Sequence, residues 1–89
     1  MKAILSVIGK DKLGIIAAVS KQLSELCINI EDISQTIMQE YFTMIMLVDT
    51  KNCTIPFDDI TKKLNNLGKE LNLEIRLQHE DIFNTMHKV

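Results

Sequence analysis

The order in which two hydrophobic periods follow one another is the feature of this sequence that most constrains its fold. Runs or alternations of apolar residues, typical of β-strands, occupy residues 3–8, 29–38, 41–49 and 73–78. Apolar residues at every third or fourth position, typical of amphipathic helices, occupy residues 14–26 and 55–71. The 89 residues therefore predict one domain with the order strand, helix, strand, strand, helix, strand.

This order predicts an α+β fold, a ferredoxin-like βαββαβ sandwich. Right-handed crossovers through the two helices, with a hairpin between the second and third strands, give an antiparallel four-stranded sheet in the order 4-1-3-2 with both helices on one face. The second strand, 29–38, is the most polar and is expected at an edge. The other face keeps apolar residues, so we expect a partner chain or the C-terminal tail to cover part of it.

Composition and charge argue against several classes of function. The net charge of −2 does not provide the basic surface that binds nucleic acid or an anionic membrane. No stretch approaches the roughly 18 apolar residues of a membrane span, and we expect a cytoplasmic protein. Cys27 and Cys53 form neither a disulfide framework nor a zinc set, and we expect free thiols.

Candidate catalytic groups are present by residue type only. His79 and His87 lack a third ligand at a spacing that suits a metal site. The adjacent carboxylates of Glu31-Asp32 and Asp58-Asp59 are interpreted as solvated or helix-end charges. We therefore predict a protein that is not an enzyme and that has no cofactor.

The loop between the first predicted strand and helix carries the residues of greatest chemical interest. Gly9 and Gly14 bracket a turn that opens the helix, and the N–H groups around 13–16 favour a carboxylate there. Asp11 offers a carboxylate to an ammonium group, and Asn29 offers both a donor and an acceptor. These groups suit a free amino acid. They are equally consistent with a helix cap at Asp11, close packing at Gly14 and a turn at Asn29.

A resemblance to a known family rests on the run from Val7 to Ser20, VIGKDKLGIIAAVS, and on the later pair Asn29-Ile30. This pattern resembles the opening of an ACT domain, most closely the small stand-alone proteins of the UPF0237 group. The likeness covers nearly the whole chain and implies an ACT domain over residues 1–79. A tail follows at 80–89, in which apolar residues have helical spacing.

The resemblance also implies a function and a site. ACT domains typically bind an amino acid at a dimer interface, between the first loop of one subunit and the second strand of its neighbour. By this resemblance the ligand-binding residues are Gly9, Asp11, Leu13, Gly14 and Ile15 on one wall, and Asn29 and Ile30 on the other. The edge strand 29–38 would pair with its twin to form a homodimer. The alternative is a module that regulates a partner enzyme through its surface, without a small ligand.

One departure from the family pattern bears on the backbone. Cys27 stands where a glycine commonly ends the first helix of these domains. If the backbone there is left-handed, a cysteine is strained by about 1 kcal/mol.

Overall fold

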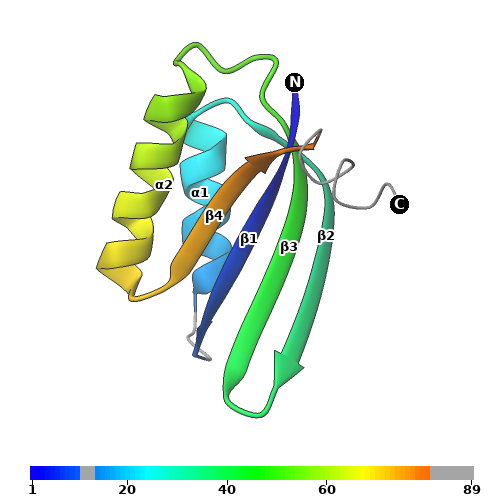
Figure 1. Cartoon of the computed structure of the whole chain (residues 1–89), viewed down its shortest axis with the longest axis vertical. Coiled ribbons are helices and arrows are strands. Elements are labelled where there is room, and N and C mark those ends of the chain that lie inside the picture. Colours follow the sequence, from blue (N-terminus) through cyan, green and yellow to red (C-terminus); the bar gives the residue numbers. More distant parts are fainter. Residues whose placement is uncertain (11–13, 81–89) are drawn as a thin grey trace.

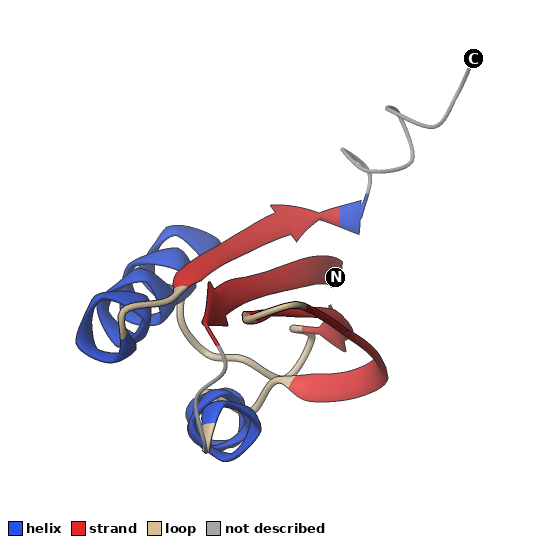
Figure 2. Ribbon diagram, turned by 90° about the horizontal axis from the view of Figure 1, so that it is seen from below, coloured by secondary structure: helices blue, strands red, loops and turns tan. Residues whose placement is uncertain are grey.

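The computed structural model describes residues 1–10 and 14–80 and confirms the predicted order of elements (Figure 1). The elements are β1 (Lys2–Lys10), α1 (Ile15–Glu25), β2 (Asn29–Met38), β3 (Tyr41–Asp49), α2 (Phe57–Leu71) and β4 (Glu74–His79). The strands form one antiparallel sheet in the order β2-β3-β1-β4, which is the predicted order read from the other edge. Both helices lie on the same side of the sheet (Figure 2), so the ferredoxin-like sandwich is confirmed.

Alternating burial along the two central strands shows which face of the sheet meets the helices. The buried residues of β1 and β3 are Ala3, Leu5, Val7, Phe42, Met44, Met46 and Val48. They form one core with the buried stripes of α1 and α2. We call this side of the sheet the helix face. The intervening residues of β1 and β3 point to the opposite side, which we call the open face.

The residues of β2 are mostly exposed on both faces of the sheet. Ile33, Gln35 and Ile37 lie opposite buried residues of β3 and therefore belong to the helix face, whereas Ser34 and Thr36 belong to the open face. This is the alternation that the sequence predicts. A register shift between Ile30 and Asp32 marks a bulge near the start of β2. Within the described residues β2 pairs with β3 alone, so the prediction of an edge strand is confirmed.

Several predicted element boundaries need correction. The strand β1 continues through Gly9 and Lys10, which the sequence places in a turn. The helix α1 starts after Gly14, whose backbone is left-handed at the N-cap, so Asp11 is not the N-cap residue. The second helix starts at Phe57, with Pro56 extended at its N-cap, two residues later than predicted.

The end of α2 also differs from expectation. Gly68 inside a helical stripe suggests a frayed last turn, yet the helix continues to Leu71 and Gly68 is buried. A Cβ built on Gly68 would lie 2.8 Å from the carbonyl oxygen of Leu73. Asn72 then adopts the left-handed conformation, and the Leu73 N–H donates to the Gly68 carbonyl at 2.7 Å. The glycine therefore allows a tight return from α2 into β4.

Candidate ligand site and dimer edge

The start of α1 presents backbone N–H donors that no side chain of residues 1–10 and 14–80 caps. Gly14, with φ of 83°, is the N-cap, and within the described part of the chain no side chain caps the helix. The first turn contains no acidic residue. The first N–H groups of a helix have no partner within the helix, and they lie at the positive end of the helix dipole. The predicted wall at Gly14 and Ile15 therefore has the chemistry to accept a carboxylate. Asp11 and Leu13 lie outside the described residues.

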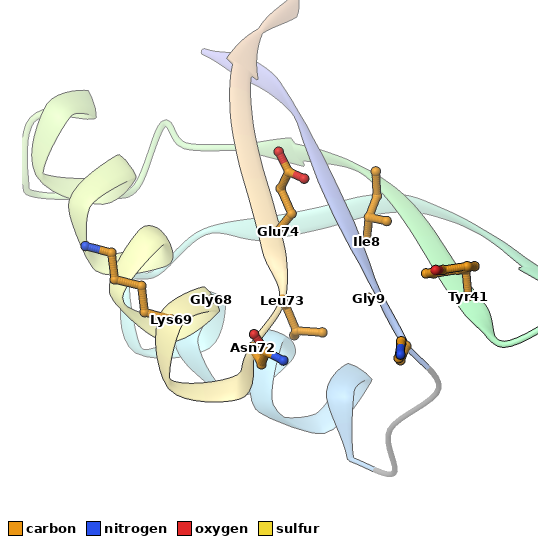
Figure 3. A pocket seen from close by; sticks show the side chains of 9 residues that line it. Ile8, Gly9, Tyr41, Gly68, Lys69, Asn72, Leu73 and Glu74 are labelled. Carbon is orange, nitrogen blue, oxygen red and sulfur yellow. The ribbon is translucent and has the colours of Figure 1, made fainter.

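Gly9 lies beside the turn that joins α2 to β4. A Cβ built on Gly9 would overlap the side chain of Leu73. Ile8, Gly9, Tyr41, Leu73 and Glu74 line part of an open cleft of about 480 Å³ at this end of the sheet (Figure 3). Gly9 therefore has a packing role next to that cleft, which the sequence alone does not reveal.

Two of the charged groups that line this cleft are already paired or point outward. The Glu74 carboxylate accepts from the Arg76 guanidinium at 2.9 Å, and the Lys69 side chain points away from Leu73 in Figure 3. Neither Gly14 nor Asn29 is among its lining residues. Reasoning from the sequence missed the cleft. The signal that was available is Asn72, an asparagine directly after the helical stripe, where left-handed C-caps are common.

The second predicted wall lies at the other end of the sheet. Asn29 begins β2 opposite Asp49, which in turn lies opposite Lys2 on β1. Gly9 follows Lys2 by seven residues along the same strand, and at about 3.4 Å per residue that separates Gly9 from the level of Asn29 by roughly 24 Å. Figure 1 shows the start of α1 at the end of the sheet where β1 finishes, and the start of β2 at the opposite end. One chain therefore does not bring Gly14 and Asn29 together.

The surroundings of Asn29 are charged and already paired. The Asp49 carboxylate accepts from the backbone N–H of Lys51 at 3.0 Å and contacts the N-terminal ammonium of Met1 at 3.3 Å. The hydrogen bond from Lys51 is the largest influence, and together with the ammonium it outweighs the effect of burial and lowers the pKa of Asp49. The Lys2 ammonium lies 3.4 Å from the Glu31 carboxylate. These charged groups have partners within the chain, whereas Asn29 is exposed to solvent.

The free edge of β2 is bordered by exposed apolar side chains. Ile33 and Ile37 are 39% and 63% exposed on the helix face, and Ile16 in the first turn of α1 is 39% exposed on the same side of the sheet. We call Ile16, Ile33 and Ile37 the edge strip. An edge strand with unpaired backbone groups and apolar neighbours is suited to pairing with another strand.

A family model for the ACT domain matches residues 2–78. The chain belongs to the ACT-domain family. Full-length relatives narrow the assignment. A UPF0237 protein from Clostridium acetobutylicum is 58% identical over 89 residues, covering all of both chains. A UPF0237 protein from Listeria innocua is 53% identical over the same extent, and one from Methanocaldococcus jannaschii is 49% identical over 88 residues, covering 99% of this chain and 98% of its own.

Solved structures agree with the fold of this ACT domain. An ACT domain protein from Streptococcus pneumoniae has a TM-score of 0.83 at 44% identity, with 93% of each chain covered. A formyltetrahydrofolate deformylase from Pseudomonas putida has a TM-score of 0.78 at 12% identity and covers 88% of this chain but 28% of its own. The second comparison concerns the fold alone. The predicted membership in the UPF0237 group of ACT domains is confirmed.

Other candidate groups of this ACT domain have structural explanations. His79 stacks on Phe57 with ring centroids 4.3 Å apart, which joins the end of β4 to the start of α2. Both cysteines are free thiols, and Cys27 has the left-handed φ of 59° that its position suggested. Among residues 1–10 and 14–80 no group of three or more His, Cys, Asp or Glu side chains is placed to hold a metal ion. The helices in that part of the chain are all too short or too polar to cross a membrane.

Proposed function

We propose that this ACT domain is a cytoplasmic, non-enzymatic regulatory module that binds an amino acid or a similar small metabolite at the interface of a homodimer. The observation that carries the proposal is the separation of Gly14 from Asn29 at opposite ends of a sheet in which β2, among the described residues, pairs with β3 alone. A ligand site that needs both residues needs a second chain.

Antiparallel pairing of β2 with a second β2 supplies the missing half. The strand runs from Asn29 to Met38, so its antiparallel twin runs the other way and places the twin's first residues beside Met38. Met38 lies opposite Tyr41, which lies opposite Lys10, at the end of the sheet where α1 begins. The paired edges would form a continuous eight-stranded sheet, and the edge strip would be covered by the neighbouring chain.

The chemistry of the two walls suits an α-amino acid. The backbone donors at the start of α1 would receive the α-carboxylate. The Asn29 amide would orient the ligand through one donor and one acceptor group. The Asp11 carboxylate would receive the ammonium group, and the family resemblance assigns Gly9, Leu13 and Ile15 to the same first wall. Ile30, half-buried beside Asn29, would contact the apolar part of the ligand.

A regulatory role is consistent with the proteins that share this fold. A regulatory subunit of aspartate kinase from Thermus thermophilus superposes with a TM-score of 0.67 at 24% identity. A putative glycine cleavage system transcriptional repressor superposes with a TM-score of 0.73 at 22% identity. At these identities only the fold is shared, so the regulatory role of this chain depends on the site described above.

A thermal-shift screen of the purified protein against the twenty amino acids tests the proposal. A ligand present at a hundred times its Kd stabilises the native state by about 2.7 kcal/mol. For a domain of this size that raises the melting midpoint by about 10–20 °C. Asn29→Ala should abolish the shift, whereas Asn65→Ala, a matched change on the exposed side of α2, should leave it intact. A screen with no shift for any compound would contradict ligand sensing and favour the partner-enzyme alternative.

A further inference from the structure

The open face of the sheet carries an apolar surface that the proposed ligand site and the β2 edge leave uncovered. Ile8, Tyr41 and Ile45 are 43%, 48% and 47% exposed there, with Ile4 and Leu47 half-buried beside them. We propose that a second copy of this chain packs face to face on the open face, related by a two-fold axis that runs parallel to the strands between β1 and β3. This contact is separate from the β2 edge and does not rest on the proposed ligand site.

The strand register gives the pattern of this surface row by row. In the central row Ile45 lies between Ser34 on β2 and Ser6 on β1, so a branched side chain projects between two short ones. In the row towards the N-terminal end of β1, Leu47 lies beside Ile4. The middle of the open face therefore has a projection on β3 and a recess on β1.

A two-fold axis parallel to the strands matches the projection to the recess. The sheet order β2-β3-β1-β4 places the centre of the sheet between β3 and β1, so this axis puts β1 of one copy over β3 of the other at the same row. Ile45 then faces Ser6 of the second copy, and Ile4 faces Leu47. Each pair occurs twice, once on each side of the axis, as a closed symmetric interface requires.

At the rim of this interface, the same axis places hydrogen-bond donors of one copy over acceptors of the other. It puts β4 of one copy over β2 of the other. Three residues of β4 then face residues of β2 in the second copy: Gln78 faces Asp32, Glu74 faces Thr36 and Arg76 faces Ser34. Asp32 lies one row away from Arg76. Each of these pairs joins a hydrogen-bond donor to an acceptor, and no two like charges face each other. An apolar centre inside a polar rim is the usual anatomy of a protein interface.

A two-fold axis perpendicular to the strands gives a poorer match. It places each strand over its own copy, so Arg76 near the axis faces Arg76 across the interface, and Ile45 faces Ile45 while Ser6 faces Ser6. Like charges would repel, two projections would collide and two recesses would leave a void. The arrangement of residues on the open face therefore favours the axis parallel to the strands.

The mass of the purified full-length protein, measured by light scattering during size-exclusion chromatography, tests the contact. The β2-edge axis and the open-face axis pass through different parts of the sheet and do not meet, so the two contacts together do not close at four chains. With both surfaces paired, the wild type should elute with more than two chain masses. Ile45→Arg on the open face should lower the mass to two chain masses, and so should Ile37→Arg on the β2 edge, whereas the double variant should be a single chain. Asn65→Arg, an exposed change on α2, should keep the wild-type mass.

These variants separate the two interfaces. If Ile37→Arg alone changes the mass and folded Ile45→Arg does not, the open-face contact is overturned while the edge dimer stands. If Ile45→Arg alone halves the mass, the open-face contact stands and the edge dimer fails. Circular dichroism establishes that each variant is folded. Ser6→Lys provides a second change on the open face should Ile45→Arg fail to fold.

Cross-linking tests the orientation of the axis. Chains carrying Ser6→Cys and chains carrying Ile45→Cys, both with Cys27→Ser and Cys53→Ser and with different tags, are mixed and treated with a short bis-maleimide. The axis parallel to the strands predicts that the mixed Ser6–Ile45 product exceeds either product of like chains. Dominance of the Ser6–Ser6 product would overturn the proposed orientation.

Discussion

The side chain of Leu73 occupies the space that a Cβ on Gly9 would need. This relationship joins the last residues of β1 to the connection between α2 and β4, two segments far apart in sequence. The backbone of the same leucine also approaches Gly68, where its carbonyl oxygen would lie 2.8 Å from an added Cβ. The side chain of Leu73 therefore faces Gly9, and its carbonyl oxygen faces Gly68.

The two glycines should differ in their tolerance of alanine. At Gly9 the added methyl meets the end of the Leu73 side chain, and overpacking of this kind costs about 1–3 kcal/mol. Leu73→Ala in the same chain removes the overlap, so the double variant should be more stable than the sum of the single effects predicts. Urea unfolding of the four proteins measures the coupling. Strict additivity would contradict the contact.

At Gly68 the added methyl meets a backbone oxygen, which cannot rotate away. Gly68→Ala should therefore lower stability despite the gain of about 1 kcal/mol in helix propensity that alanine brings, and Leu73→Ala should not rescue it. Asn66→Gly in the same helix serves as the control for propensity alone. A more stable Gly68→Ala protein would show that the turn into β4 is looser than described.

Replacing Cys27 by glycine should stabilise the protein. The residue has a φ of 59°, and the left-handed conformation costs an ordinary side chain about 1–2 kcal/mol. Part of that gain is offset by the entropy of glycine in the unfolded chain, which leaves about 0.5–1 kcal/mol. Thermal unfolding under reducing conditions measures the change. Ser24→Gly, in the right-handed last turn of α1, should lower the stability. If both glycine variants changed the stability in the same direction, this explanation would be contradicted.

The stabilising effect of Asp49 should depend on pH. Its folded-state pKa is lowered below the ordinary value of 3.8, chiefly by the Lys51 N–H. Its contribution is therefore complete above that ordinary value and is lost as the pH falls through the lower folded-state pKa. Wild type should be more stable than Asp49→Asn at neutral pH, and the difference should shrink below pH about 4. A difference that stays constant down to about pH 2 would contradict this assignment.

The stacked pair of Phe57 and His79 should show direct coupling. The rings lie 4.3 Å apart with an interplanar angle of 26°. Aromatic pairs contribute about 0.5–1.5 kcal/mol beyond the area that they bury. A double-mutant cycle with Phe57→Ala and His79→Ala should return a coupling of that size from denaturant unfolding. A coupling near zero would mean that the two rings pack independently.

The sequence predicts the fold well because each element has a periodic apolar stripe. The alternation along β2 correctly separates Ile33, Gln35 and Ile37, on the helix face, from their neighbours on the open face. The helical stripe through Ile60 and Leu64 is buried as expected. The boundaries are less predictable. Apolar Ile55 extends the second helical stripe although Pro56 keeps the backbone extended. Local periodicity does not separate a helical residue from an apolar residue just before the helix.

The parts of the candidate site that escaped prediction depend on tertiary contacts. Gly68 looks like a weak point of a helix until Leu73 is placed beside it, and nothing in the local sequence gives that contact. Gly9 similarly reads as a loop residue rather than a packing position in β1. Gly14 and Asn29 are singled out by their chemistry and by the family resemblance. The roughly 24 Å between Gly9 and the level of Asn29, which puts them at opposite ends of the sheet, follows only from the strand register.

That offset has a consequence for how the protein would respond in a cell. In the proposed dimer each ligand spans two chains, so occupancy and association share one equilibrium. Ligand affinity measured at low protein concentration should then be weaker than at high concentration, because part of the binding energy is spent in joining the chains. The abundance of the protein would set the metabolite level to which it responds, so a change in its expression would retune the sensor without any change in its sequence.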